Sequence, residues 1–251
     1  MIFEISSRAN PRLNELLAHR RERFFFEGEK LVADVLARGL TVSQLIFTAA
    51  METRLPPISA AVGEYWRVSR SVMEKISELK TPPEIVVVLP LPVPALDFKG
   101  SQVIFGLDSI QDPANLGAVF RCAAAFGISA LALAGSCVRA NHPKVVRAAQ
   151  TALIDMPFGV FPDLEDLIAR AQSQNVHIYA TGSHAAKNNL AIEQIEFPCL
   201  VLFGNEGQGL EKKTLRGFPL IRLEQSARMD SLNVAVSACI LMHEMKRVHG
   251  L

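Results

Sequence analysis

The sequence lacks any strong imbalance of charge. Its 26 Lys and Arg face 25 Asp and Glu, which leaves a formal net charge of +1 over 251 residues. A chain balanced in this way has no global field that would draw it to nucleic acid or to an anionic membrane. Any binding of a polyanion must therefore depend on local groups of basic residues.

Cysteines are few, and none are spaced as metal ligands or as a redox pair. Cys122, Cys137, Cys199 and Cys239 stand singly in apolar stretches, with no CxxC motif. We expect four buried, reduced thiols of a cytosolic protein, and we expect no bound metal.

No segment has the pattern of a membrane anchor or of a secretion signal. The longest uncharged run, 122–138, contains glycine and serine and is shorter than the roughly 20 apolar residues that cross a bilayer. The first residues, MIFEISSRANPR, carry Glu4 and Arg8 and lack the apolar centre of a signal peptide. The expected location is the cytoplasm, with no membrane partner.

Three common catalytic signatures are missing from the sequence. The first strand expected after residue 100 runs into DSIQDPANLG, not into the GxGxxG of nucleotide-dependent dehydrogenases. No glycine-rich loop ends in GKS or GKT, and His243 and Glu244 begin no HExxH zinc motif. These absences argue against a dehydrogenase, a P-loop enzyme and a zinc hydrolase.

The N-terminal part of the chain predicts a small α/β sandwich. Two amphipathic helical segments fall within 10–39, and strands are expected at 40–48, 64–69 and 85–92. Pro90, Pro92 and Pro94 lack amide protons and favour extended backbone. The linker is therefore expected at about 89–100, between domains at 1–95 and 101–251.

From residue 101 onward, strands alternate with helices. Strands are expected at 103–107, 128–134, 176–182, 198–204 and 219–223, and helices at 113–126, 143–153, 163–173 and 233–248. This alternation predicts an α/β fold, in which helices cover both faces of a mostly parallel sheet. Ligands of such folds bind at the carboxyl ends of the strands.

The segment LDSIQDPANLGAVFRCAAAFG predicts a helix with clear ends. Asp112 is placed to cap it, Pro113 to occupy its first position and Gly127 to end it. The expected buried stripe comprises Leu116, Val119, Phe120 and Ala123. Asn115 and Arg121 can project from the helix where a ligand would bind. Taken alone, the pattern fits a capped helix with a surface arginine better than a site.

The segment LVLFGNEGQGL places three glycines directly after an expected buried strand. Gly204, Gly207 and Gly209 follow a GxxGxG order, and the missing β-carbons let the backbone approach a ligand. Glu206 in this loop can accept hydrogen bonds from hydroxyls or amines, although a solvated loop glutamate is the commoner explanation for a single such residue.

The segment MDSLNVAVSACILMHEM opens a long apolar helix with short polar residues. Asp230, Ser231 and Asn233 are suited to bind the free amides of a helix N-terminus. The helix then stays almost wholly apolar to Met242. We expect it to be buried against the sheet or against a second subunit.

Together and in this order, the three segments resemble the motifs of the SpoU (TrmH) class of SPOUT RNA 2'-O-ribose methyltransferases: NxGxxxR, LxxGNEGxGL and SLNVxV. The stretch EGEKLVADVLARGLTVSQLIFT is similar to the L30e-like RNA-binding domain of many members. The resemblance implies S-adenosylmethionine as cofactor, a C-terminal trefoil knot in the second domain, and a homodimer. Its substrate would be RNA, with ribosomal RNA favoured over transfer RNA.

The resemblance also assigns site residues. The implied catalytic residues are Asn115, Arg121, Glu206, Ser231 and Asn233, and the implied cofactor contacts are Leu202, Gly204, Gly209, Ile221, Leu223 and Leu232. An arginine is almost always protonated, so Arg121 would hold the target phosphate and stabilise developing oxyanion charge. Because Arg222 stands where proline is usual, Ile221 and Leu223 are alternative contacts.

Two basic clusters are candidate RNA contacts. Arg8, Arg12, Arg20, Arg21 and Arg23 precede three consecutive phenylalanines, and Arg139, Lys144 and Arg147 form a second, acid-free group. For any single arginine a solvated helix face explains the charge equally well, and we interpret Phe24–Phe26 as core. Ala149 and Thr151 stand where the family commonly has serine and glycine. The alternative function is a catalytically silent RNA-binding paralogue, which retention of Arg121 and Glu206 disfavours.

Overall fold

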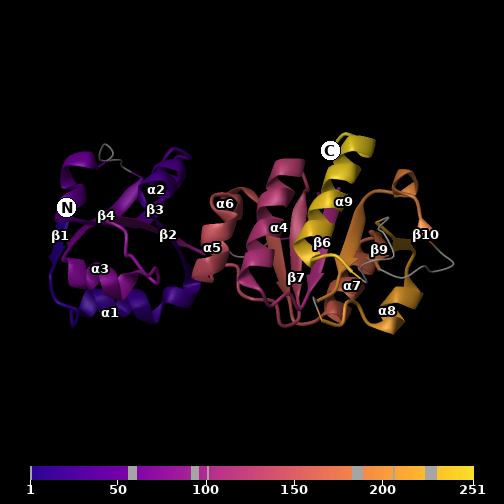
Figure 1. Ribbon diagram of the computed structural model, residues 1–251, viewed down its shortest axis with the longest axis horizontal. Coiled ribbons are helices and arrows are strands. Elements are labelled where there is room, and N and C mark those ends of the chain that lie inside the picture. The colour runs from indigo at the N-terminus through magenta and orange to yellow at the C-terminus, as the bar shows by residue number, and fades with distance from the viewer. Residues whose placement is uncertain are drawn as a thin grey trace. The chain divides into compact units, whose positions relative to one another are not determined.

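The computed structural model describes residues 2–55, 61–91, 96–100, 102–182, 189–205, 207–223 and 231–251. They form two compact units (Figure 1). Unit 1 combines Met1–Val93 with Asn141–Thr151, and unit 2 combines Pro94–Ala140 with Ala152–Leu251. Each unit has its own sheet and its own core.

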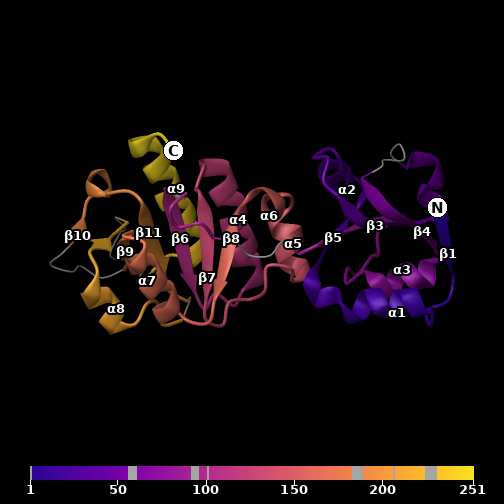
Figure 2. The ribbon, with the colours of Figure 1, turned by 180° about the vertical axis from the view of Figure 1, so that it is seen from behind.

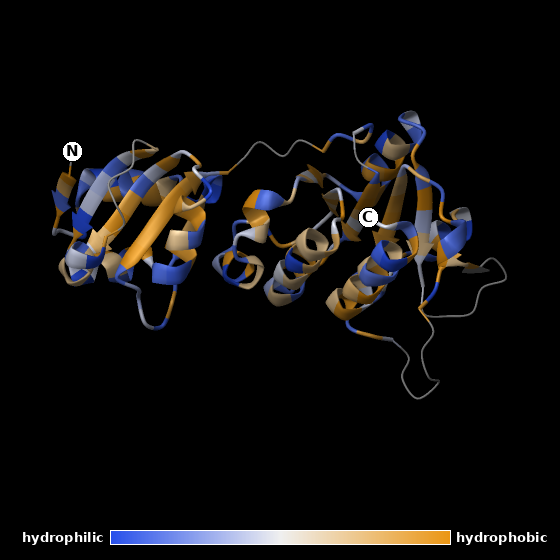
Figure 3. Ribbon diagram, turned by 90° about the horizontal axis from the view of Figure 1, so that it is seen from above, coloured by the Kyte–Doolittle hydropathy of each residue, from blue (hydrophilic) through white to orange (hydrophobic). Residues whose placement is uncertain are grey.

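Unit 1 is built on a five-stranded mixed sheet. Its strands are β1 (Ile2–Ile5), β2 (Arg23–Glu27), β3 (Val42–Thr48), β4 (Val62–Val68) and β5 (Ile85–Pro90), in the order β1-β4-β3-β5-β2. β4 pairs in parallel with β1 and β3, whereas β5 pairs antiparallel with β3 and β2. The central strands are largely hydrophobic (Figure 3), as strands buried on both faces must be.

Helices lie on both faces of this sheet. Residues of α1 (Pro11–Ala18) and α3 (Arg70–Ile76) share one hydrophobic cluster with Phe25 and Trp66. The helix α2 (Glu29–Leu36) lies on the opposite face (Figure 1). Short 3₁₀ turns, η1 (Arg20–Glu22) and η2 (Ala49–Arg54), complete the unit. Phe24, Phe25 and Phe26 are at most 6% exposed, so their interpretation as core is confirmed.

Unit 2 contains a seven-stranded sheet whose pairings are all parallel. Its strands are β6 (Val103–Asp108), β7 (Ala130–Ala134), β8 (Phe158–Phe161), β9 (His177–Thr181), β10 (Asn189–Leu190), β11 (Cys199–Phe203) and β12 (Leu220–Ile221). Their order is β10-β12-β9-β11-β6-β7-β8. The expectation of a mostly parallel sheet is confirmed.

Helices cover both faces of the parallel sheet, again as expected. The helices α4 (Pro113–Phe126) and α9 (Val234–His249) pack together on one face (Figure 1). The helix α7 (Leu164–Ser173) covers the other (Figure 2), where its apolar residues join those of the strands in one cluster. Smaller elements are α6 (Ala152–Asp155), η3 (Ile192–Gln194) and α8 (Lys212–Gly217). Within the described ranges, no helix is long and apolar enough to cross a membrane.

The single helix expected at 143–153 is wrong. The helix α5 (Pro143–Ala149) ends where Gln150 adopts a φ of 55°, a left-handed conformation that stops helical hydrogen bonding. The chain then starts α6, and the segment Asn141–Thr151 belongs to unit 1 although both of its flanks belong to unit 2. Strand patterns at β1, β2 and β8 were also missed, because each is short and carries no alternation.

Candidate active site

The order of strands in unit 2 marks one edge as the place for a ligand. From β6 the chain proceeds to β7 on one side, whereas from β11 it proceeds to β12 on the other side. The strands β6 and β11 are parallel neighbours, and Phe203 of β11 pairs with Leu107 of β6 near their carboxyl ends. Such a switch point opens a crevice beyond the strand ends. The first and second sequence motifs both begin there.

The first motif forms the helix that its sequence predicts. Asp112 caps α4, its Oδ1 accepting a hydrogen bond from the amide of Ala114 at 2.9 Å, and Gly127 ends it with a φ of 76°. Leu116, Val119, Phe120 and Ala123 are all fully buried. Asn115 is itself only 8% exposed, so its polar side chain is placed inside the structure and requires partners.

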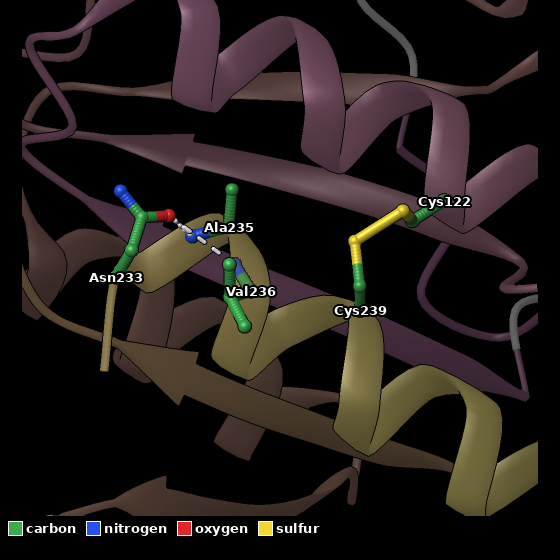
Figure 4. The surroundings of a disulfide bond; sticks show 5 residues. All are labelled: Cys122, Asn233, Ala235, Val236 and Cys239. Carbon is green, nitrogen blue, oxygen red and sulfur yellow. Dashed lines mark hydrogen bonds between the residues drawn. A yellow bond between two sulfur atoms is a disulfide. The ribbon is translucent and has the colours of Figure 1, made fainter. Parts of the chain in front are cut away.

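Asn233 joins the third motif to the first. Its Oδ1 accepts hydrogen bonds from the amides of Ala235 at 2.9 Å and Val236 at 3.2 Å, which caps α9 (Figure 4). Because that oxygen faces the helix, the amide nitrogen points away from it, and Nδ2 donates to Oδ1 of Asn115 at 3.0 Å. One side chain therefore both starts α9 and fixes it to α4.

A second link joins the same two helices. Cys122 and Cys239 form a disulfide with a Cα–Cα distance of 5.5 Å (Figure 4). Cys122 lies seven residues after Asn115, on the same face of α4 and roughly 10 Å further along it. The expectation of four reduced thiols is thus wrong for two of them. Their 117-residue separation gives no local signal, because the pairing arises only when α4 and α9 pack together.

The second motif folds into a tight loop after β11. A β-carbon on Gly204 would overlap the backbone of Gly209 and Leu210, so only glycine fits there. Oδ1 of Asn205 accepts hydrogen bonds from the amides of Gly207 at 3.0 Å and Gln208 at 2.7 Å. The amide of Gly209 donates to the carbonyl of Asn205 at 3.0 Å. The loop is therefore fixed by its own backbone and by one asparagine.

The expected cofactor residues lie at this edge or next to it. The side chains of Leu202 and Ile221 are at most 1% exposed, so only their backbone can face a ligand. Gly209 has a φ of +66° and open space where a β-carbon would be. Leu223 is partly buried two residues beyond the end of β12, and Leu232 is 38% exposed before α9.

Two further expected catalytic residues lie on or next to the helices that carry the asparagine pair. Arg121 is exposed on α4, and Ser231 is exposed two residues before Asn233. Glu206 and Asp230 lie outside the described residues. The structure thus brings Asn115 and Asn233 together, and it places Arg121 on the same helix as Asn115.

Sequence reasoning missed residues that tie the loops after β6 and β7 together. Ser109 adopts a φ of 57°, and its Oγ donates to Oδ1 of Asp108 at 2.8 Å while accepting from the amide of Ser136 at 3.4 Å. Sγ of Cys137 donates to the carbonyl of Leu107 at 3.3 Å. Burial raises the pKa of the Cys137 thiol to about 11. No sequence pattern marks the contacts of Ser136 and Cys137, since each joins the segment after β7 to the end of β6.

A cavity of about 620 Å³ in unit 2 is lined by residues that include Phe98, Phe161 and Arg170, and no motif residue lines it. Among the described side chains, no group of three or more His, Cys, Asp and Glu could hold a metal ion.

Comparison with known sequences identifies both parts of the chain. The profile of the SpoU rRNA Methylase family matches residues 102–243, and that of the MRM3-like substrate binding domain matches residues 17–87. The chain is 29% identical over 224 residues to the 23S rRNA (guanosine(2553)-2'-O)-methyltransferase RlmP of Bacillus subtilis, covering 89% of this chain and 88% of RlmP. It is 27% identical over 264 residues to a tRNA/rRNA methyltransferase of Synechocystis, covering 98% and 94% of the two chains.

Solved structures show the same architecture over the whole chain. The AdoMet-bound rRNA methyltransferase from Sinorhizobium meliloti superposes with a TM-score of 0.81 at 26% identity, covering 100% of this chain and 99% of that one. An RNA 2'-O ribose methyltransferase superposes with a TM-score of 0.75 at 26% identity, covering 99% of this chain and 100% of its own.

Proposed function

The chain belongs to the SpoU rRNA Methylase family, and from this membership we propose that its target is a ribose 2'-hydroxyl of ribosomal RNA. It is an RNA 2'-O-ribose methyltransferase that uses S-adenosylmethionine. The proposal for ribosomal RNA is supported by the similarity to RlmP. The observation that carries the assignment of the site is the bond between Asn115 and Asn233, which joins the first and third motifs.

The loop after β11 suits a cofactor held by backbone. Gly204 leaves no room for a side chain, and Gly209 leaves open space beside the backbone. Leu202 lies near the end of β11 and Ile221 ends β12, and the side chains of both are buried. We therefore assign the adenosine-binding contacts to Gly204, Gly209 and the strand ends, with Leu223 and Leu232 beside them. When bound, S-adenosylmethionine supplies a methyl group activated by a sulfonium.

The protein must position a weakly acidic hydroxyl and relieve it of its proton. Arg121 is exposed and projects from α4, where its guanidinium can hold the target phosphate in two hydrogen bonds and stabilise developing negative charge. Asn115 and Asn233 fix the start of α9, and with it Ser231, relative to α4. We assign Glu206 to the same site on its place in the second motif.

The test measures cofactor binding and methyl transfer separately. Calorimetric titration with S-adenosylmethionine should show binding that survives Arg121→Ala, while transfer of labelled methyl to unmodified ribosomal RNA should fall roughly 100-fold or more. Arg216→Ala, which removes an exposed arginine of the same unit, is the matched control and should change neither. Nuclease digestion must then release a 2'-O-methylated nucleotide.

The outcomes separate the candidate functions. If the methyl group is transferred only to tRNA, the protein is still a methyltransferase, but its substrate is tRNA and not ribosomal RNA. Cofactor binding without transfer to any RNA would contradict catalysis by this chain, and no cofactor binding by the folded protein would favour a silent RNA-binding paralogue.

We also propose that the protein is a homodimer formed through α9. Val236 and Ile240 are 48% and 40% exposed, and their spacing of four places them on one face of α9. Leu232, which is 38% exposed, lies just before the helix begins. Val236→Glu should give a monomer by light scattering. Val160→Glu is the matched control, because Val160 is 61% exposed on β8 of the same unit and should leave the dimer intact. A wild-type monomer would refute this proposal.

The assignment of the units follows from the same family membership. We propose that unit 1 is an L30e-like RNA-binding domain, supported by the match to a substrate binding domain, and that unit 2 carries catalysis. A trefoil knot is proposed for the chain between β11 and α9, supported by the membership in the SpoU family. A cytoplasmic location is proposed because ribosomal RNA is the substrate.

A further inference from the structure

Parts of the two basic clusters, which lie far apart in the sequence, meet in unit 1: Lys144 and Arg147 belong to this unit, whereas Arg139 belongs to unit 2. The helix α5 packs on β2, with Val145 and Val146 buried. Asn141, just before the helix, lies with Nδ2 within hydrogen-bonding distance of three carbonyls, those of Arg20 at 3.4 Å, Arg21 at 2.7 Å and Arg23 at 3.2 Å. One asparagine side chain thus holds the start of α5 against the backbone of residues 20–23.

The arginines of this turn have different roles. Arg20 is directed inward: Nη1 donates to the carbonyl of Ile76 at 2.6 Å, Nε lies 3.1 Å from Glu78, and the guanidinium lies over the ring of Phe25. Arg21 next to it is exposed and has no ion pair with any described residue. The anchored arginine therefore fixes the turn that presents the free one.

Apart from Arg20, the cations around Asn141 have no ion pair within the described ranges, in contrast to others of unit 1. Four arginines elsewhere in the unit are neutralised by glutamates: Arg12 by Glu64, Arg54 by Glu29, Arg67 by Glu4 and Arg70 by Glu84. Lys144 and Arg147 are exposed on α5 and have no ion pair within the described ranges. Residues 113–154 contain no Asp or Glu. The buried Nε of Arg23 also lacks a hydrogen-bond partner in the described part of the chain.

We propose that Arg21, Arg23, Lys144 and Arg147 form one phosphate-binding surface for the RNA substrate, the α5–β2 basic surface, with Asn141 as its positioning residue. The inference rests on the proposed RNA substrate, and it names the residues of unit 1 that contact the phosphate backbone of that RNA. It resolves how a chain of net charge +1 can bind a polyanion, because a local group of unpaired cations releases counterions from phosphates whatever the total charge.

The test is the salt dependence of RNA binding by the full chain. A fluorescein-labelled, unmodified RNA hairpin is titrated by anisotropy at several KCl concentrations. Each phosphate contact contributes roughly 0.7 to 0.9 to the slope of log K against log salt. Arg21→Gln with Lys144→Gln should therefore lower the slope by about 1.4 to 1.8, and weaken binding about 15- to 30-fold near 0.15 M salt.

A matched control removes the same charge from an arginine that is already neutralised. Arg67 lies 3.2 Å from Glu4 and 3.1 Å from Glu52, so Arg67→Gln should leave the slope unchanged. If the control and the double variant change the slope equally, the proposed α5–β2 basic surface is wrong, whereas the proposed RNA substrate still stands. If the wild-type protein binds S-adenosylmethionine but no RNA, the proposed function fails as well.

Discussion

Reduction of the Cys122–Cys239 disulfide should destabilise unit 2 by several kcal/mol. The bond closes a loop with a sequence separation of 117 residues. In the chain-entropy account, a loop of this length raises the free energy of unfolding by about 4.9 kcal/mol at 25 °C, because the cross-link restricts the unfolded chain. With a urea dependence of roughly 2.5 kcal/mol per M, the midpoint should fall by about 2 M on reduction.

The location of the only tryptophan allows the two units to be followed separately. Trp66 is 2% exposed in the core of unit 1, so its fluorescence reports on that unit, whereas circular dichroism follows both. Dithiothreitol should lower the transition seen by circular dichroism and leave the fluorescence transition nearly unchanged. The variant Cys122→Ser with Cys239→Ser should unfold like the reduced protein and should not respond to dithiothreitol.

The control variant is Cys137→Ser, which removes a thiol of the same unit and leaves the disulfide intact. It should retain the full response to reductant. Equal urea midpoints for oxidised and reduced wild-type protein would refute the reasoning, as would a serine double variant that still responds to dithiothreitol.

Three further predictions concern the loops and caps of unit 2. Asn233→Ala removes the cap of α9 and the hydrogen bond that Nδ2 donates to Asn115, which should cost roughly 2 to 4 kcal/mol in urea unfolding. Asn233→Ser should recover about 1 kcal/mol of this, and no recovery would contradict the capping role. Gly204→Ala should abolish calorimetric binding of S-adenosylmethionine, because the new methyl group would overlap the backbone of Gly209 and Leu210. Gly207→Ala should bind the cofactor normally, because a β-carbon there meets only a side-chain oxygen at 3.7 Å. Equal binding by both variants would refute the steric argument. Burial raises the pKa of Cys137 to about 11, and only the thiolate is alkylated. The rate of its reaction with iodoacetamide should therefore increase about tenfold per pH unit between pH 8 and 10. A rate that stops rising below pH 9 would contradict the effect of burial.

Local signals in the sequence were sufficient to predict individual elements. The ends of α4 follow from Asp112, Pro113 and Gly127, whose preferences depend on backbone conformation and on one nearby amide. The parallel sheet followed from alternating helices and strands. The ordered motifs predicted the family, whose profile covers residues 102–243.

Contacts between distant elements could not be predicted from the sequence. Nothing local distinguishes Cys122 and Cys239, which pair, from Cys137 and Cys199, which do not. The left-handed conformation of Gln150 is similarly hidden, because glutamine has no preference for it. The roles of the candidate catalytic residues remain predictions from the family, apart from the observed bond between Asn115 and Asn233.

The membership of Asn141–Thr151 in unit 1 affects how the protein can be made and divided. During synthesis, residues 1–93 leave the ribosome well before the segment that completes their unit, so the first unit cannot finish folding until part of the second has been translated. A fragment cut at residue 93 would lack α5, and the surface of β2 that buries Val145 and Val146 would face water. Such a fragment should aggregate more readily than one to which residues 141–151 are restored.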